Sequence, residues 1–445
     1  MLEKNFKEKI IQIFSEGINQ YFAEESACRA DISSSLISLD APKEKLHGDI
    51  TSNIAMVLAK QVKANPVILA QHISEKIKKI FNQRSDINSF IDGIEVKGAF
   101  INLWLSDKYY ENILLEIFKN KEKFGQNSDF GGKRVNIEFV SANPTGPLTI
   151  AHARQAAIGD ALARILKFNG YDVTTEYYLN DCGRQINMLG KSLEIRYRNL
   201  CGKEDSLPED GYVGEYVIDI AKEIKEKHGE MFLEETEKTS NFFRKYAVES
   251  IMNLIRKDLE DFRVHFDVWT SQAEFEERKI VERTLEELEK AGYLYEQDGA
   301  KWFKSTAFGD DKDRVVRKSD GSYTYLAPDI AYHKDKYLRK FEKIIDLLGP
   351  DHHGYINRMK AAVSAMGYDK SSIDILIVQL ATLLRNGVAV SMSTRRAEFI
   401  SLREIIDEIG VDVARLIFLM RRRDSHLDFE FEVAKKEATD RKDCT

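Results

Sequence analysis

The chain has 445 residues, of which 43% are apolar and 31% are charged, and its formal net charge at pH 7 is −7. This length predicts about three domains, and the negative net charge argues against indiscriminate binding to nucleic acids. No apolar run approaches membrane-spanning length, the charged start MLEKNFKEKI argues against a signal peptide, and the four scattered cysteines lack a CxxC pair. We therefore expect a cytoplasmic protein without a membrane segment, disulfides or a zinc site.

Residues 1–107 are predicted to form a small α+β domain. The segment opens with a helical pattern and continues through HGDITSNIAMVLAK, which reads as a loop entering an amphipathic helix. Pro66 starts another helix, because proline is favoured in the first turn. The segment closes on two strand-like pieces, FIDGIEVKG and AFINLWLS.

Residues 108–400 are predicted to form a doubly wound parallel α/β domain. After a polar, glycine-rich entry loop (122–134), an apolar run at 135–140 predicts a strand, 141–147 a Pro/Gly loop and 149–168 an amphipathic helix. Gly170 lies where a C-terminal cap belongs, and a second apolar run begins at Tyr171. This order is typical of a nucleotide-binding unit in which the loop delivers a ligand to the helix N-terminus.

The rest of the chain extends this domain and adds a helical end. The pattern at about 192–270 is helical and charged, so we expect a helical insertion between the halves of the sheet. Strand patterns return at 343–349 and 374–380 with a helix between them, which indicates parallel pairing. From Ser401 the pattern is helical again, and 401–445 is predicted to begin a C-terminal helical region.

Five segments carry a resemblance that covers essentially the whole chain: VNIEFVSANPTGPL, EYYLNDCGRQI, SDGSYTYLAPDIAYH, LLGPDHHGYINRMKAA and MSTRRAEFISLREIIDEIGVDVARLIFLMRRRDSHLDF. Their wording and order resemble the arginyl-tRNA synthetases, which are class I aminoacyl-tRNA synthetases. The first 107 residues are similar to that family's N-terminal domain, which binds the tRNA elbow. The resemblance implies a Rossmann-like catalytic domain, activation of L-arginine by ATP with Mg²⁺, and transfer of the arginine to tRNA.

The resemblance also implies an arginine pocket. Its expected residues are Glu138, Asn143, Tyr325, Asp329 and Gln379. A planar guanidinium requires acceptors in a fork geometry, so Asp329 and Tyr325 are expected to face it, and Glu138 and Asn143 to bind the α-amino end. Without the resemblance, the favoured interpretation would be a packed aromatic at Tyr325 and a helix cap at Asp329.

The nucleotide motifs differ from the family pattern. The family's His-x-Gly-His corresponds to 149–152, where Thr149 has a shorter reach than histidine and Ala151 adds a methyl group that glycine lacks. The family's Lys-Met-Ser-Lys loop corresponds to SMSTRR at 391–396, which lacks the leading lysine. Without the resemblance, a lone His152 near a helix start reads as a capping or core residue.

By resemblance, we still assign roles at these motifs. Catalytic roles are expected for Thr149, His152, Ser393 and Arg395. Nucleotide contacts are expected from Thr149, Ala151, His152, Asp351, His353, Gly354 and Met392. Two adjacent histidines without a suitably spaced third ligand do not predict a protein-bound metal.

The resemblance leaves three hypotheses open. In the family an anticodon-binding domain follows the stretch that ends this chain, so the sequence reads as C-terminally truncated, and a separate C-terminal chain would supply that domain. The first hypothesis is an arginine–tRNA ligase, weakened or dependent on that chain. The second is a non-catalytic or repurposed relative that binds arginine or tRNA. The third is a folded but inactive product of a damaged gene.

Overall fold

The computed structural model describes residues 2–24, 33–385, 387–389 and 399–442. The chain divides into two compact units, 1–127 and 128–445. Three residues with expected roles, Met392, Ser393 and Arg395, lie outside the described residues. None of the described helices combines the length and the apolar character that crossing a membrane requires.

The first unit packs helices against a small antiparallel sheet of order β1-β3-β2. Its elements are α1 (Leu2–Glu24), β1 (Ile50–Ser52), α2 (Ile54–Val62), α3 (Pro66–Gln83), α4 (Ser85–Asn88), β2 (Ile91–Lys97), β3 (Phe100–Leu105) and α5 (Asp107–Asn120). Helix α3 begins where expected, since Asn65 Oδ1 accepts a hydrogen bond from Val67 N at 2.9 Å and proline follows the cap.

The first unit extends past the boundary at 107 that the sequence predicts, because α5 packs with the helices before it. Tyr109 on α5 lies 4.6 Å from Phe6 and 6.3 Å from Phe90 between ring centroids. Tyr109 and Ile113, in the first two turns of α5, pack on the core of the first unit, whereas Leu115 and Phe118 further along the helix are exposed.

The second unit is built on the parallel sheet that the sequence predicts. Its strand order is β11-β10-β4-β5-β6, and every pair is parallel. The strands are β4 (Arg134–Glu138), β5 (Asp172–Leu179), β6 (Val268–Ser271), β10 (Lys343–Leu348) and β11 (Ile373–Ile377). The chain proceeds from β4 to one side and later returns to the other side, so the strand order reverses between β4 and β10. Ligands of doubly wound sheets bind at this switch point.

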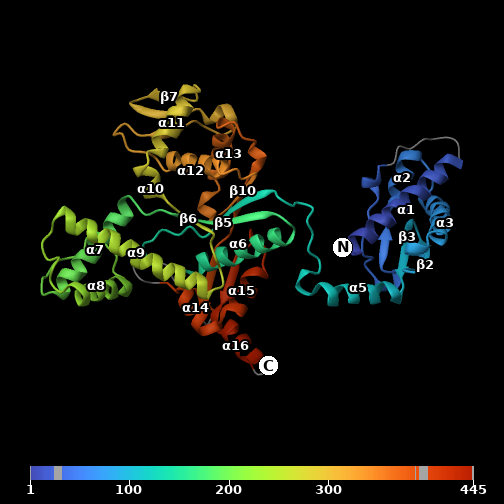
Figure 1. Ribbon diagram of the computed structural model, residues 1–445, viewed down its shortest axis with the longest axis horizontal. Coiled ribbons are helices and arrows are strands. Elements are labelled where there is room, and N and C mark those ends of the chain that lie inside the picture. Colours follow the sequence, from blue (N-terminus) through green and yellow to red (C-terminus); the bar gives the residue numbers. More distant parts are fainter. Residues whose placement is uncertain (1, 25–32, 386, 390–398, 443–445) are drawn as a thin grey trace. The chain divides into compact units, whose positions relative to one another are not determined.

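Helices cover both faces of the sheet, as Figure 1 shows. Helix α6 (Ile150–Phe168) lies on one face, and α12 (Leu326–Leu338) and α13 (Tyr355–Ala365) lie on the other. Strand residues alternate between two cores: Ile345 faces the α6 core and Ile344 the α12 core. The apolar runs of these strands are thereby explained, because both faces are buried.

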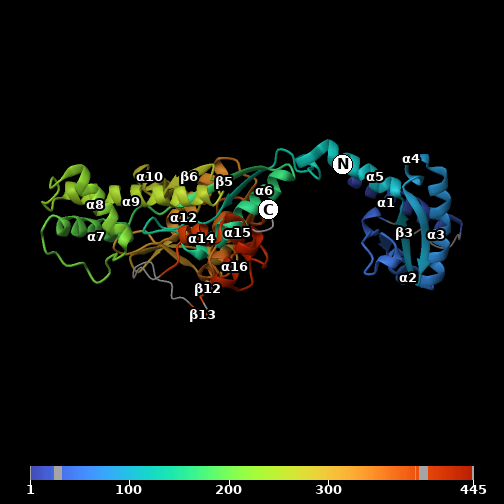
Figure 2. The same cartoon turned by 90° about the horizontal axis from the view of Figure 1, so that it is seen from below.

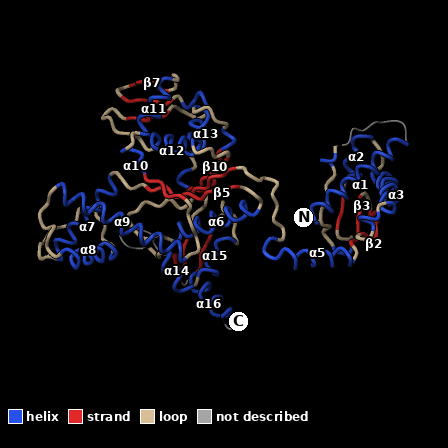
Figure 3. Tube along the Cα trace, viewed as in Figure 1, coloured by secondary structure: helices blue, strands red, loops and turns tan. Residues whose placement is uncertain are grey.

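Two further subdomains interrupt the sheet. The helical insertion expected from the sequence consists of α7 (Arg184–Leu200), α8 (Glu215–His228) and α9 (Glu237–Asp261), which lie together in Figures 1 and 2. A second subdomain contains α10 (Gln272–Glu277), α11 (Ile280–Lys290) and an antiparallel sheet of β7 (Leu294–Gln297), β8 (Ala300–Phe303) and β9 (Arg314–Arg317), visible in Figure 3. The sequence did not predict this small sheet.

The last part of the chain is mainly helical and includes a small sheet. Its elements are β12 (Ala381–Arg385), β13 (Val388–Ala389), α14 (Leu402–Ile409), α15 (Val411–Leu419), β14 (Leu427–Glu430) and α16 (Phe431–Lys442). Gly410 separates α14 from α15, since its φ of 86° breaks the continuous helical pattern read from the sequence.

Candidate functional site

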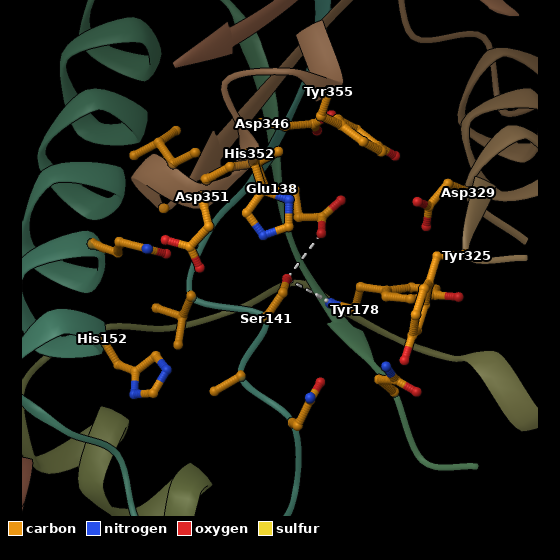
Figure 4. A pocket seen from close by; sticks show the side chains of 18 of the residues that line it. Glu138, Ser141, His152, Tyr178, Tyr325, Asp329, Asp346, Asp351, His352 and Tyr355 are labelled. Carbon is orange, nitrogen blue, oxygen red and sulfur yellow. Dashed lines mark hydrogen bonds between the residues drawn. The ribbon is translucent and has the colours of Figure 1, made fainter. Parts of the chain in front are cut away.

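A cavity of about 1020 Å³ opens at the carboxyl ends of β4, β5 and β10. It lies at the switch point of the sheet and takes further walls from the loop after β4, the start of α6 and the start of α12. Figure 4 shows Glu138 and Ser141 between Asp329 and Tyr325 on one side and His152 on the other. The cavity therefore has two ends, with the last strand residue of β4 between them.

Most of the expected site residues that the structure describes line this cavity. They are Glu138, Asn143, Ala151, His152, Tyr325, Asp329, Asp351 and Gln379. Three others do not line it: Thr149 is the buried N-cap of α6, and His353 and Gly354 are exposed in the turn before α13. The adjacent His352 lines the cavity instead of His353.

The loop after β4 holds a strained turn that orients Glu138. Val140 and Ser141 have φ values of 68° and 37°, and Ser141 N donates to Phe139 O at 2.9 Å across Val140. A positive φ at a β-branched residue is costly and persists only where the surroundings impose it. The turn directs Ser141 Oγ, which donates to Glu138 Oε1 at 2.9 Å and accepts from Tyr178 N at 3.1 Å.

Three acidic residues, here called the carboxylate row, lie side by side on the α12 face of the sheet. Glu138 is in register with Asp346 on β10 and with Glu176 on β5, and all three are buried. Glu176 is held by Asn136 Nδ2 at 2.6 Å and by Arg339 Nη2 at 3.0 Å. A row of buried carboxylates requires such partners, because an unpaired buried charge is very costly.

Helix α12 supplies the cations for the rest of the row. Lys336 Nζ, which is fully buried, lies 2.6 Å from Glu138 Oε2 and 2.9 Å from Asp346 Oδ1. His333 Nε2 lies 2.7 Å from Asp346 Oδ2. Burial disfavours charge on all of these groups, but the cations outweigh it at Asp346 and hold its pKa well below the usual range. The same contacts raise the pKa of Lys336 and of His333 against the effect of burial.

Asp329 is the carboxylate that α12 presents to one end of the cavity. Burial raises its pKa to about 6, and the Tyr355 hydroxyl offsets part of that rise. Among the described residues, no cation pairs with Asp329 within ion-pair distance, in contrast to Glu138 and Asp346. Tyr325, one helical turn earlier, is 84% exposed, which excludes a packed aromatic. Asp329 lies in the first turn of α12 but is not its cap, which is Tyr325.

The other end of the cavity is the N-terminus of α6. Thr149 N donates to His152 Nδ1 at 3.1 Å, so His152 closes a capping box. Burial lowers the pKa of His152 to about 4, which keeps the ring neutral at pH 7. With Nδ1 accepting, Nε2 carries the proton and is the ring's remaining donor. The capping role read from the residues is therefore present together with a place in the cavity wall.

Several cavity residues were missed by sequence reasoning. They are Ser141, Gln155, Tyr178, Gln185, His333, Asp346 and Tyr355. One signal was available for Asp346, a single acid inside the apolar run KIIDLL, because a buried carboxylate in a strand demands a partner. Another was the spacing of His333, Lys336 and Arg339, three cations at intervals of three on one helix face.

Two family models match the chain. The model "tRNA synthetases class I (R), catalytic domain" matches residues 113–430, and the model "Arginyl tRNA synthetase N terminal domain" matches residues 2–105. The chain belongs to the arginyl-tRNA synthetase family. The doubly wound parallel sheet expected of that family's catalytic domain is confirmed.

Relatives of the family align over most of the chain. The chain is 47% identical to arginine–tRNA ligase 1 of Halalkalibacterium halodurans over 400 residues, which cover 89% of this chain and 71% of that protein. It is 45% identical to the arginine–tRNA ligase of Bacillus subtilis, with the same coverage of both proteins. The solved structure of a putative arginyl-tRNA synthetase from Campylobacter jejuni has a TM-score of 0.69 at 38% identity, covering 74% of this chain and 72% of that one.

Proposed function

We propose that this protein is an arginine–tRNA ligase that activates L-arginine with ATP and transfers the arginyl group to tRNA. In the first step an oxygen of the arginine carboxylate attacks the α-phosphorus, the bond to the β-phosphate oxygen breaks, and pyrophosphate leaves. In the second step a terminal ribose hydroxyl of the tRNA attacks the arginyl carbonyl and AMP leaves. The named relatives favour this hypothesis over a non-catalytic or repurposed protein.

The distribution of charge at one end of the cavity carries the proposal. Glu138 already has Lys336 as a cation partner, whereas Asp329 has none among the described residues and points into the cavity. A guanidinium pairs best with a carboxylate that is not yet neutralised. We therefore place the guanidinium at Asp329 beside Tyr325, and the α-ammonium at Glu138.

Asn143 is oriented for the same end of the substrate. Its Nδ2 donates to Gln185 Oε1 at 2.8 Å, which turns Oδ1 towards other donors. A carbonyl oxygen in this position accepts a hydrogen bond from the substrate α-ammonium. Gln379 Oε1 accepts from Leu380 N at 3.0 Å, so the amide nitrogen of Gln379 remains to donate.

The α6 end of the cavity is proposed to bind ATP. Free N–H groups at a helix N-terminus favour phosphates, and His152 Nε2–H adds one donor. The methyl group of Ala151 lies where a glycine would let ATP approach the helix backbone more closely, so we expect weak ATP binding. Mg²⁺ is expected with ATP, because this ion is held largely by phosphates and water, and the described residues form no cluster of metal ligands.

Titration calorimetry with L-arginine and with ATP tests the proposal. We expect measurable binding of L-arginine and weaker binding of ATP to the unliganded protein. Aminoacylation of an arginine-accepting tRNA, assayed with ATP and Mg²⁺, tests the reaction itself. Tight ATP binding without any arginine binding would contradict the assignment of the two ends of the cavity.

The partners that follow from this function are L-arginine, ATP and an arginine-accepting tRNA. A cytoplasmic location is proposed because charged tRNA is used there. The separate C-terminal chain expected from the sequence finds no support in the comparisons and stays a prediction.

A further inference from the structure

Glu138 is fixed from two sides by residues that no substrate has to displace. Ser141 Oγ donates to Oε1 at 2.9 Å, and Lys336 Nζ lies 2.6 Å from Oε2. Figure 4 shows the carboxylate pointing into the cavity with Ser141 beside it. Both oxygens therefore have a set direction, and each keeps a second lone pair for a ligand.

Lys336 lies outside the cavity, and several neighbouring groups contact its ammonium. It is 0% exposed and does not line the cavity. Its ammonium also lies over the ring of Tyr332 at 4.4 Å, and Tyr332 stacks on the cavity residue Tyr178 with centroids 4.4 Å apart. Because these contacts fix the ammonium of Lys336, the Glu138 carboxylate that it binds is held in one position as well.

We propose that Lys336 is a positioning residue for amino-acid recognition: it holds Glu138 so that the carboxylate receives the substrate α-ammonium, and it leaves Asp329 as the partner of the guanidinium. The inference rests on the proposed function. Lys336 compensates the charge of Glu138 and sets its angle, whereas the guanidinium end has no contact with Lys336. Removing the lysine then impairs recognition of the α-ammonium alone.

A charge-balanced double variant tests this role. Lys336→Met alone leaves the buried Glu138 carboxylate without a cation and Asp346 with His333 alone, which endangers folding. Lys336→Met with Asp346→Asn removes one charge of each sign and still frees Glu138. We expect this variant to bind L-arginine about tenfold more weakly, the scale of one charge-assisted hydrogen bond. The affinity for 5-guanidinopentanoate, which lacks only the α-ammonium, should change by less than about twofold.

The same row offers a matched control. Arg339→Met with Glu176→Gln also removes one ion pair, between the half-buried Arg339 and the buried Glu176, but neither residue lines the cavity. We expect both ligands to bind this control as they bind the unmodified protein, with calorimetry as the measurement and thermal unfolding to confirm folding.

Each other outcome overturns the inference in a recognisable way. If the unmodified protein binds L-arginine and the Lys336 variant binds it equally well, the positioning role is wrong and the proposed function stands. An equal loss for both ligands, or the same loss in the control, would indicate a structural role only. If the unmodified protein binds no L-arginine, the proposed function fails and this inference fails with it.

Discussion

Arg154 on α6 joins the helix to two segments far away in the sequence. Its side chain is fully buried, and its two terminal nitrogens donate to four backbone carbonyls. Nη1 donates to Gln379 O at 2.8 Å and Leu380 O at 3.2 Å, and Nη2 to Arg422 O at 3.0 Å and Ser425 O at 2.9 Å. Gln379 and Leu380 line the cavity, so the arginine supports its wall.

Replacing Arg154 with Met keeps the apolar stem and removes all four donors. The Leu380 and Arg422 carbonyls each keep a second backbone donor, at 3.3 and 3.1 Å, so the loss falls mainly on Gln379 O and Ser425 O. A hydrogen bond from a charged group contributes about 1.5–3 kcal/mol, so two of them amount to about 3–6 kcal/mol. We expect Arg154→Met to lower the free energy of unfolding of the second unit by about 4 kcal/mol.

Urea unfolding followed by circular dichroism measures this loss, and Arg164→Met on the same helix is the control. The Arg164 side chain is 61% exposed and pairs with Asp160 at 2.8 Å, so its replacement should cost about 1 kcal/mol or less. A loss for Arg154→Met no larger than that of the control would refute the bridging role.

Three further predictions concern the core and the site. Gly159→Ala should lower the melting temperature and cost about 1–3 kcal/mol or more of the free energy of unfolding, because the new Cβ would lie 2.2 Å from Phe139 Cγ. An unchanged unfolding transition would contradict this packing. L-Arginine should bind more weakly as the pH falls through about 6, because Asp329 then takes up a proton and loses its negative charge; calorimetry from pH 5 to 8 should show this, and Asp329→Asn should abolish the dependence. Thr149→His with Ala151→Gly should raise arginine-dependent ATP–pyrophosphate exchange, assayed with tRNA, by about tenfold or more, and no gain in a folded variant would count against ATP binding at the α6 end.

Local patterns fixed the elements that surround the site. The apolar run before Ser141, the loop with two prolines and the helical spacing from Thr149 to Phe168 predict β4, the loop and α6. The strand ends at Glu138, two residues before the predicted end, because the chain turns at Val140 and Ser141. Such patterns are readable because each strand and helix buries a defined face. The strands of β7, β8 and β9 have only four residues each, which is too short for a pattern to stand out.

The family resemblance located several of the residues that line the cavity, but not the contacts that orient them. Glu138, Asn143 and Asp329 were singled out by resemblance, and their roles in binding stay predictions. The motif does not reveal that one ring, that of His152, both caps α6 and faces the cavity. No local pattern reports which of a side chain's two nitrogens is already occupied.

The sequence by itself determined the family, the alternation of strands and helices, and the altered nucleotide motif, because these depend on residue identity and near-neighbour spacing. The tertiary structure alone decided that Glu138, Asp346 and Glu176 form one row and that Lys336 holds two of them. Glu138 and Lys336 are 198 positions apart. Only the register of β10 on β4, and the docking of α12 over that register, bring these charges within hydrogen-bonding distance.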